Sequence, residues 1–261
     1  MKPKFMWTIV VVLAASLSVM AQTKRQYPVR GEINRSFQLS PNAQIDVASI
    51  EGSVKVETTD SNRAELHYVR HALTQADFDC ESIDVQDGPS RLSIEHRTNR
   101  SCRVIQAYEE LRLIIPQSAN LTLTGIEGDF MVGKTDGYLH LKGIEGSVQV
   151  GEVQAGELTG IEGNITLSVA RLDSQGITVR GIEGNVELRV ADNLNANLRV
   201  RAADRVDIDL PNAPNKRSGA NSFQSEEEDS PRHGSTELQL GAGGPQILIS
   251  GIEGRVRVRG M

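Results

Sequence analysis

Apolar and polar residues alternate with a period of two along most of this chain. After Gly163, for example, Ile165, Leu167 and Val169 are apolar and the residues between them are polar. A β-strand with one buried face shows this period, because successive side chains point to opposite sides of the strand. The pattern predicts an all-β protein built from short strands.

The tetrapeptide Gly-Ile-Glu-Gly recurs between the alternating stretches. Four copies are spaced 18, 17 and 21 residues apart, and they start at Gly125, Gly143, Gly160 and Gly181. A fifth copy starts at Gly251, and a degenerate sixth starts at Ser49. Such repeats are typical of proteins in which each unit buries its apolar face against the next one.

The alternation changes phase at each tetrapeptide. Leu139 and Leu141 are apolar at odd positions, whereas Ile144 and Val148 are apolar at even ones. This shift would expose the core side chains unless the backbone turns or bulges there, and glycine permits both. We therefore expect the glycine-isoleucine step to be a corner between two strands.

These features predict a single-stranded β-solenoid, similar to a parallel β-helix, with stacked rungs of about 18 residues. The alternative is an antiparallel β-sandwich, in which Asp136-Gly137 would serve as a hairpin turn. The predicted segments are a signal peptide (1–21), less regular β rungs (22–124), regular rungs (125–211), a disordered polar loop (212–236) and a final β rung (237–261).

The N-terminus has the pattern of a secretory signal. Lys2 and Lys4 precede an apolar run over residues 6–19, and small or aliphatic residues lead to Ala21. The alternative is an uncleaved membrane anchor, but the apolar run is shorter than the roughly 20 residues that a membrane-spanning helix needs. We expect an exported protein, periplasmic or on the cell surface or extracellular, with no stable membrane span after cleavage.

The net charge of the chain limits the kinds of molecule that it is expected to bind. Removing residues 1–21 takes away two lysines and no acids, so the formal net charge changes from −6 to −8. An acidic chain of this kind argues against nucleic acid and against an anionic membrane surface. The partner itself, an envelope, surface or protein component, stays unidentified.

Cys80 and Cys102 are the two cysteines of the chain. In an oxidising compartment a single pair usually forms a disulfide, so we predict a Cys80–Cys102 bond. The alternative is two buried free thiols.

An acidic row is the main candidate for ligand binding. Glu127, Glu145, Glu162 and Glu183, with Glu253, occupy equivalent positions of the repeat and should point outward. Stacked strands would place them about 4.8 Å apart, where like charges repel one another and a Ca²⁺ ion could relieve the repulsion. A solvated acidic edge is the simpler interpretation, so Ca²⁺ is only a weak candidate.

The sequence contains no recognisable catalytic or cofactor-binding motif. His67 and His71 lie in a predicted strand, where four residues span about 13 Å, too far to share one ion. The sequence also shows no nucleophile elbow and no phosphate loop. We therefore predict no catalytic residues, no cofactor, no further metal ligands and no enzymatic activity.

The chain resembles the bacterial exported β-repeat family described as "putative adhesin", a domain of unknown function in envelope proteins. The resemblance rests on residues 31–37 and 45–56, the glycine-acid-glycine corners with valine-rich strands, the polar segment near Phe223, the glycine-rich run 241–245 and the closing repeat 247–258. It implies a β-solenoid-like fold and an envelope location, and it supplies no catalytic residues.

The sequence thus predicts a non-enzymatic, adhesin-like envelope or cell-surface protein that binds a partner through a solenoid face. One alternative is a periplasmic structural or sensing module linked to membrane regulators. A further alternative is a polysaccharide-active β-helix enzyme, which would need a groove with converging carboxylates.

Overall fold

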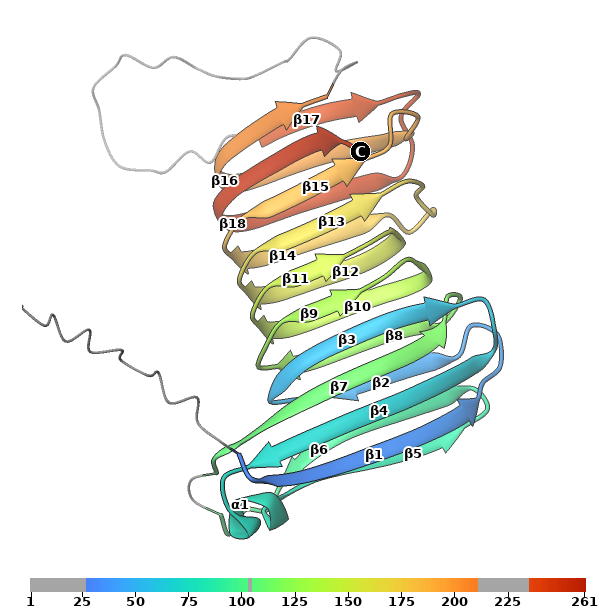
Figure 1. The fold of residues 1–261 in the computed structure, drawn as a ribbon. Helices are drawn as coiled ribbons and strands as arrows, with labels where there is room; N and C mark the ends of the chain where they lie inside the picture. The colour runs from blue at the N-terminus through green and yellow to red at the C-terminus, as the bar shows by residue number, and fades with distance from the viewer. Residues whose placement is uncertain (1–26, 103–104, 211–234) are drawn as a thin grey trace, which may run out of the picture.

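The computed structural model describes residues 27–102, 105–210 and 235–261. They form an all-β fold, one large mixed sheet in which most neighbouring strands run parallel (Figure 1). This part of the chain contains eighteen strands and one short helix, α1 (Gln75–Asp79). The predicted all-β class is confirmed, and the mostly parallel pairing contradicts the antiparallel sandwich that the sequence left open.

Strands of the repeat region stack in two parallel ladders. The first ladder holds the strands that lead into each tetrapeptide, namely β8 (Asn120–Ile126), β10 (Thr135–Glu145), β12 (Val153–Glu162) and β14 (Ile177–Glu183). The second ladder holds the strands that follow it, namely β9 (Phe130–Val132), β11 (Val148–Val150), β13 (Ile165–Val169) and β15 (Val186–Val190). One strand of each ladder makes one rung.

Both ladders continue beyond the repeats. On one side, β2 (Gln44–Ala48) and β6 (Arg91–Thr98) join the first ladder, and β3 (Gly52–Thr59) and β7 (Ala107–Pro116) join the second. On the other side, β16 (Ala196–Asp209) and β18 (Gln246–Gly260) are long enough to run through both ladders.

Antiparallel strands cover the two ends of the stack. At one end β5 (Glu81–Gly88) pairs with β6, β4 (Arg63–Ala72) pairs with β7, and β1 (Val29–Gln38) pairs with β4. At the other end β17 (Ser235–Leu240) pairs with β16. These strands satisfy backbone groups of β6, β7 and β16 that would otherwise offer an open edge to another chain.

The rungs do not stack in chain order at either end. The β2–β3 rung lies between β6–β7 and β8–β9, and β18 lies between β14–β15 and β16. The segment expected as the final rung is therefore last in the chain but not in space. Its start also differs: Ser235 and Thr236, assigned to the polar loop, begin β17, since the outer edge of β16 pairs with them.

The predicted phase change occurs at the first glycine of each tetrapeptide. Gly143 adopts φ 63°, a left-handed conformation that produces a bulge, and the register passes from Lys142 directly to Ile144. Strand β10 nevertheless continues to Glu145. The break between the two strands of a rung thus falls at the second glycine, slightly later than the expected glycine-isoleucine corner.

The second glycine permits close stacking of successive rungs. A Cβ atom on Gly146 would lie 2.5 Å from the carbonyl oxygen of Gly128, and one on Gly163 would lie 2.3 Å from that of Gly146. Only a residue without a side chain fits between backbones this close. The glycines therefore form a column along one edge of the stack, with one copy in each rung from β2–β3 to β18.

The core lies between the two ladders and runs the length of the stack. Its members are the inward residues of the alternating pattern, and equivalent positions contact one another from rung to rung. Leu123, Leu141, Leu158, Val179 and Ile249 form one such row, and each is fully buried. No rung could bury these side chains alone, so the core depends on stacking.

Two predicted segments lie outside the described residues: the signal peptide over 1–21, and residues 212–234 of the polar loop. Across the described ranges, the helical structure is too short and too polar for a bilayer crossing.

Candidate functional site

The predicted acidic row is present on the surface. Glu127, Glu145, Glu162, Glu183 and Glu253 are all exposed at the corner column. Glu145 is in register with Glu162, and Glu183 is in register with Glu253. These carboxylates follow one another along a straight row, one strand spacing apart, so they do not converge on a single point. Within the described ranges no three of them come within 4.8 Å of one another.

The outward side of the first ladder presents two columns of polar side chains. One column contains Thr122, His140, Glu157 and Thr178, and the other contains Thr124, Lys142, Thr159 and Arg180. Arg180 forms an ion pair with Glu157, and the His140 ring lies 3.8 Å from the same carboxylate. The ladder thus carries a regular face of hydroxyl and charged groups, continuous across several rungs.

A different set of polar groups lies inside the protein. Glu81, His96 and Glu109 are buried, with 4%, 5% and 1% of their surface exposed. One donor atom from each lies within 4.8 Å of the others, which is true of no other such group in the described residues. They come from β5, β6 and β7 at the end of the stack, next to the β2–β3 corner.

The alternation of the strands explains why these polar residues point inward. His96 follows Leu92 and Ile94 in the buried phase of β6, and Glu109 precedes Leu111 in the buried phase of β7. Glu81 has the same phase as Ile83 in β5. Each of the three therefore occupies a core-facing position at the end of its strand nearest the corner.

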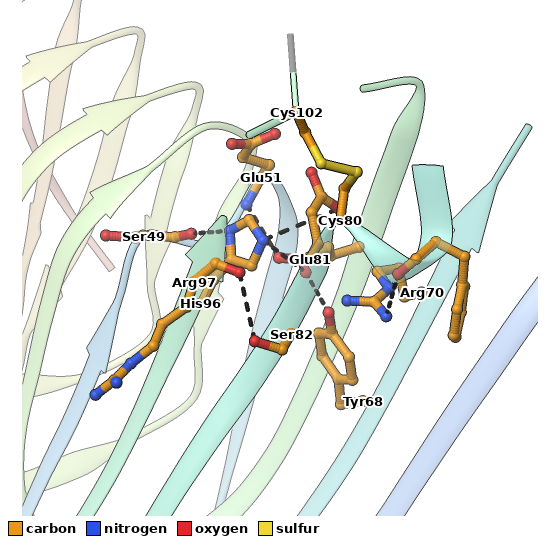
Figure 2. Close-up of polar contacts among 12 residues, drawn as sticks. Ser49, Glu51, Tyr68, Arg70, Cys80, Glu81, Ser82, His96, Arg97 and Cys102 are labelled. Atoms are coloured by element: carbon orange, nitrogen blue, oxygen red, sulfur yellow. Dashed lines mark hydrogen bonds and ion pairs between the residues drawn. A yellow bond between two sulfur atoms is a disulfide. The ribbon is translucent and has the colours of Figure 1, made fainter. Parts of the chain in front are cut away.

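Hydrogen bonds hold two of the three side chains in place. The His96 Nδ1 atom lies 2.9 Å from the carbonyl oxygen of Ser49. The Tyr68 hydroxyl donates to Glu109 Oε1, and the Glu51 backbone N–H donates to Glu109 Oε2 over 3.2 Å. Figure 2 shows the imidazole between Ser49 and Glu81, with Tyr68 approaching the cluster from β4.

Burial dominates the electrostatics of the cluster. It raises the pKa of the Glu109 carboxyl above its usual value, against the hydrogen bond from Tyr68. Burial also raises the pKa of Glu81, and the nearby His96 opposes this shift. The pKa of Tyr68 is raised by burial and by the adjacent Glu109, so the phenol stays protonated and donates.

Arg70 supplies a positive charge near the cluster without touching it. Its Nη2 atom donates to the Phe78 carbonyl over 2.8 Å, and its guanidinium stacks 4.1 Å from the centroid of the Phe78 ring. Within the described ranges it makes no ion pair. Arg70 therefore influences Glu81 and Glu109 only through the electrostatic field of its positive charge.

A disulfide lies directly beside the cluster. Cys80, the residue before Glu81, is bonded to Cys102 (Figure 2). Closing a loop of 22 residues contributes about 3 kcal/mol by restricting the unfolded chain. The bond ties the start of β5 to the segment after β6, and disulfides are typical of exported proteins.

A cavity of about 320 Å³ lies between His96 and the first residues of the acidic row. Its lining includes His96, Ser49 and the three glutamates Glu51, Glu127 and Glu145. The first members of the row thus border the same cavity as His96.

The sequence prediction named no residue of this cluster. The signal was nevertheless present, since a histidine and two glutamates stand where the alternation of their strands requires apolar residues. What the pattern did not contain was their proximity, because β5, β6 and β7 meet only through the pairing of the strands.

Comparison with known proteins gives structural likeness alone. No protein-family model matches the chain, and no curated protein sequence matches it. Solved structures similar to it include a "putative cell adhesion protein" from Clostridium sporogenes, with 10% identity, TM-score 0.37, and coverage of 88% of this chain and 100% of that chain.

Two further similar structures are described in related words. A "putative adhesin" from Bacteroides fragilis has 11% identity and TM-score 0.37, covering 90% of this chain and 99% of the other. Another from Parabacteroides distasonis has 15% identity and TM-score 0.30, with 88% and 97% covered. These structural neighbours are bacterial proteins described as putative adhesins or as a putative cell adhesion protein.

Proposed function

We propose that this chain is an exported, non-enzymatic, adhesin-like protein of the cell envelope or surface. It binds an envelope, surface or protein partner through the outward side of the first ladder. In this proposal the two ladders are the walls of a single-stranded β-solenoid, with rungs of about 18 residues in the regular part. The observation that carries the proposal is the continuous polar face described above.

The first ladder suits a binding face better than the second. Its strands β8 to β14 place two outward columns on the surface, whereas β9 and β11 are three residues long and place one outward side chain each, Met131 and Gln149. A flat face with charged and hydroxyl groups in register supplies many weak contacts to an extended partner.

Charge reversal on this face tests the proposal. The chain is expressed from its full-length sequence, recovered after export, and mixed with envelopes from cells of the producing organism that lack the gene. Sedimentation then measures the bound fraction. We expect saturable binding by the wild type and a loss of at least about tenfold in affinity for Lys142→Glu/Arg180→Glu, because both side chains are exposed on the face.

The control is Lys134→Glu/Arg171→Glu, which makes the same change in charge at exposed residues outside the face. These two residues lie 3.6 Å from Glu152 and 3.7 Å from Asp136, so the control also breaks surface ion pairs. Equal losses in the two variants, or no saturable binding by the wild type, would refute the binding face. Release of soluble sugar from the envelopes would refute the non-enzymatic assignment.

A further inference from the structure

We propose that Glu81, His96 and Glu109 bind one divalent transition-metal ion, for which Zn²⁺ is the best match. The ion would join three strands at the end of the corner column. This inference concerns a site separate from the proposed binding face and does not depend on it.

The spacing of the donor atoms fits an ion better than direct contact. His96 Nε2 lies 3.7 Å from Glu109 Oε1 and 3.9 Å from Glu81 Oε2. Charged hydrogen bonds between such groups measure about 2.7–2.9 Å, so these atoms do not bond one another. Ligands placed tetrahedrally about 2.1 Å from zinc lie about 3.4 Å apart, a few tenths of an ångström less than the two distances from His96. The donor atoms of Glu81 and Glu109 lie within 4.8 Å of each other.

The histidine is held in the form that binds metal. A carbonyl oxygen can only accept, so the contact with Ser49 places the imidazole proton on Nδ1. In the neutral imidazole, Nε2 then carries the lone pair, and this atom faces the two carboxylates (Figure 2). Metal-binding histidines commonly donate their other ring N–H to a backbone carbonyl in this way.

Unpaired buried atoms point to a missing ligand. His96 Nε2 and Glu81 Oε1 find no hydrogen-bond partner among the described residues, although both side chains are 2% exposed. Beside them, Arg70 Nε and Nη1 are also buried without a partner. Buried polar groups are almost always paired, and leaving one unpaired costs about 1–3 kcal/mol. A metal ion would satisfy the histidine nitrogen and the carboxylates together.

The local charge also favours a cation. Two buried carboxylates face one nearby positive group, Arg70, which approaches neither of them within ion-pair distance among the described residues. On the solvent side, Glu51, Glu127 and Glu145 border the cavity that reaches His96. These carboxylates would raise the local concentration of cations next to His96.

The ligand set selects among cations. Ca²⁺ and Mg²⁺ prefer oxygen ligands only, and Ca²⁺ takes six to eight of them. One imidazole and two carboxylates suit Zn²⁺ and its transition-metal neighbours. The site therefore differs from the weak calcium candidate on the acidic row in both position and metal.

The position of the site indicates what the ion does. Gly52, the last residue of the degenerate tetrapeptide, packs on Glu109, and a Cβ there would lie 1.9 Å from its carbonyl oxygen. Glu109 thus takes the place that another glycine occupies between the regular rungs. An ion at this point would fasten β5, β6 and β7 where the column of tetrapeptides ends.

Calorimetric titration tests the site directly. The exported chain, with its disulfide intact, is treated with a chelator, dialysed and titrated separately with ZnCl₂ and CaCl₂. We expect one equivalent of Zn²⁺ per chain, a rise in Tm with Zn²⁺ and no comparable effect of Ca²⁺. Glu81→Gln should weaken Zn²⁺ binding at least about tenfold, since it removes a ligand charge at nearly constant shape.

The matched control is His140→Asn, which removes a partly exposed histidine 3.8 Å from Glu157 and should leave Zn²⁺ affinity unchanged. No stoichiometric Zn²⁺ binding, equal effects of the two substitutions, or tighter binding of Ca²⁺ would overturn the proposal. If the Glu81→Gln variant does not fold, the wild type loaded with Co²⁺ tests the proposed ligands instead. X-ray absorption must then show imidazole nitrogen and carboxylate oxygen ligands, and any other ligand set refutes the site.

Discussion

Individual charged residues matter most where they are partly sheltered by neighbouring strands. Glu187 on β15 lies between Arg189 of the same strand and Arg259 of β18, and it forms ion pairs with both. Partial burial opposes its ionisation, but the two arginines outweigh this and hold the pKa of the carboxyl below its usual 4.5. The folded state therefore favours the ionised form of this side chain.

Glu187→Gln should lower stability at neutral pH and have no effect in acid. Because the folded pKa is the lower one, the stabilisation is fully present above the unfolded pKa of about 4.5 and disappears as the pH falls through the folded value. We expect a loss of about 0.5–1 kcal/mol at pH 7, measured by urea unfolding. A loss that persisted at pH 3, or an equal loss for the exposed Glu162→Gln, would contradict this account.

At the scale of elements, the decisive feature is the contact between successive corners. The first glycine of each tetrapeptide changes the phase of the strand, and the second brings two backbones together. Because the column runs through every regular rung, each corner is both a local bend and a contact between rungs.

Gly146→Ala should therefore destabilise the protein by about 1–3 kcal/mol, since the new methyl group overlaps the Gly128 carbonyl. The control is Gly133→Ala, where the methyl group would lie 3.6 Å from Thr58 Oγ1, an ordinary contact. That change should stay within about 0.5 kcal/mol. Equal thermal shifts in the two variants would show that backbone approach at the corner does not limit stability.

Across the whole molecule, the arrangement of rungs couples distant parts of the chain. The β2–β3 rung is held between strands that follow it by about 40 to 80 residues, and β18 separates β16 from the regular rungs. The end that contains β2–β3 consequently forms only when the chain has been made as far as β9, and the other end only when β18 has been made.

A chain that stops after Gly244 tests this coupling. Without β18, the antiparallel pair β16–β17 loses its parallel neighbour, and two strands alone are marginally stable in water. We expect hydrogen exchange to show lost protection over β16 and β17, while β8 to β11 stay protected. Retained protection of β16 would mean that it can stack directly on β14 and β15.

Much of the local structure could be read from the sequence. The period of two predicted the strands, since alternation marks the buried face, and the phase shift predicted a backbone irregularity at Gly143 and its equivalents. The outward direction of Glu145 and Glu162 followed from the same alternation. The position of a residue along its own strand decides these features, so they can be predicted without knowing which distant segments are in contact.

Only the tertiary structure decided which rungs are neighbours and which polar residues meet. Every rung carries a similar apolar row. Stacking in chain order would therefore bury the same kind of surface as the observed order, in which β2–β3 and β18 are inserted between other rungs. Because the alternation does not say which strands are neighbours, Glu81, His96 and Glu109 appeared in the sequence as three separate exceptions to it. The pairing of β5 with β6, and of β6 and β7 with the β2–β3 rung, brings them to one point.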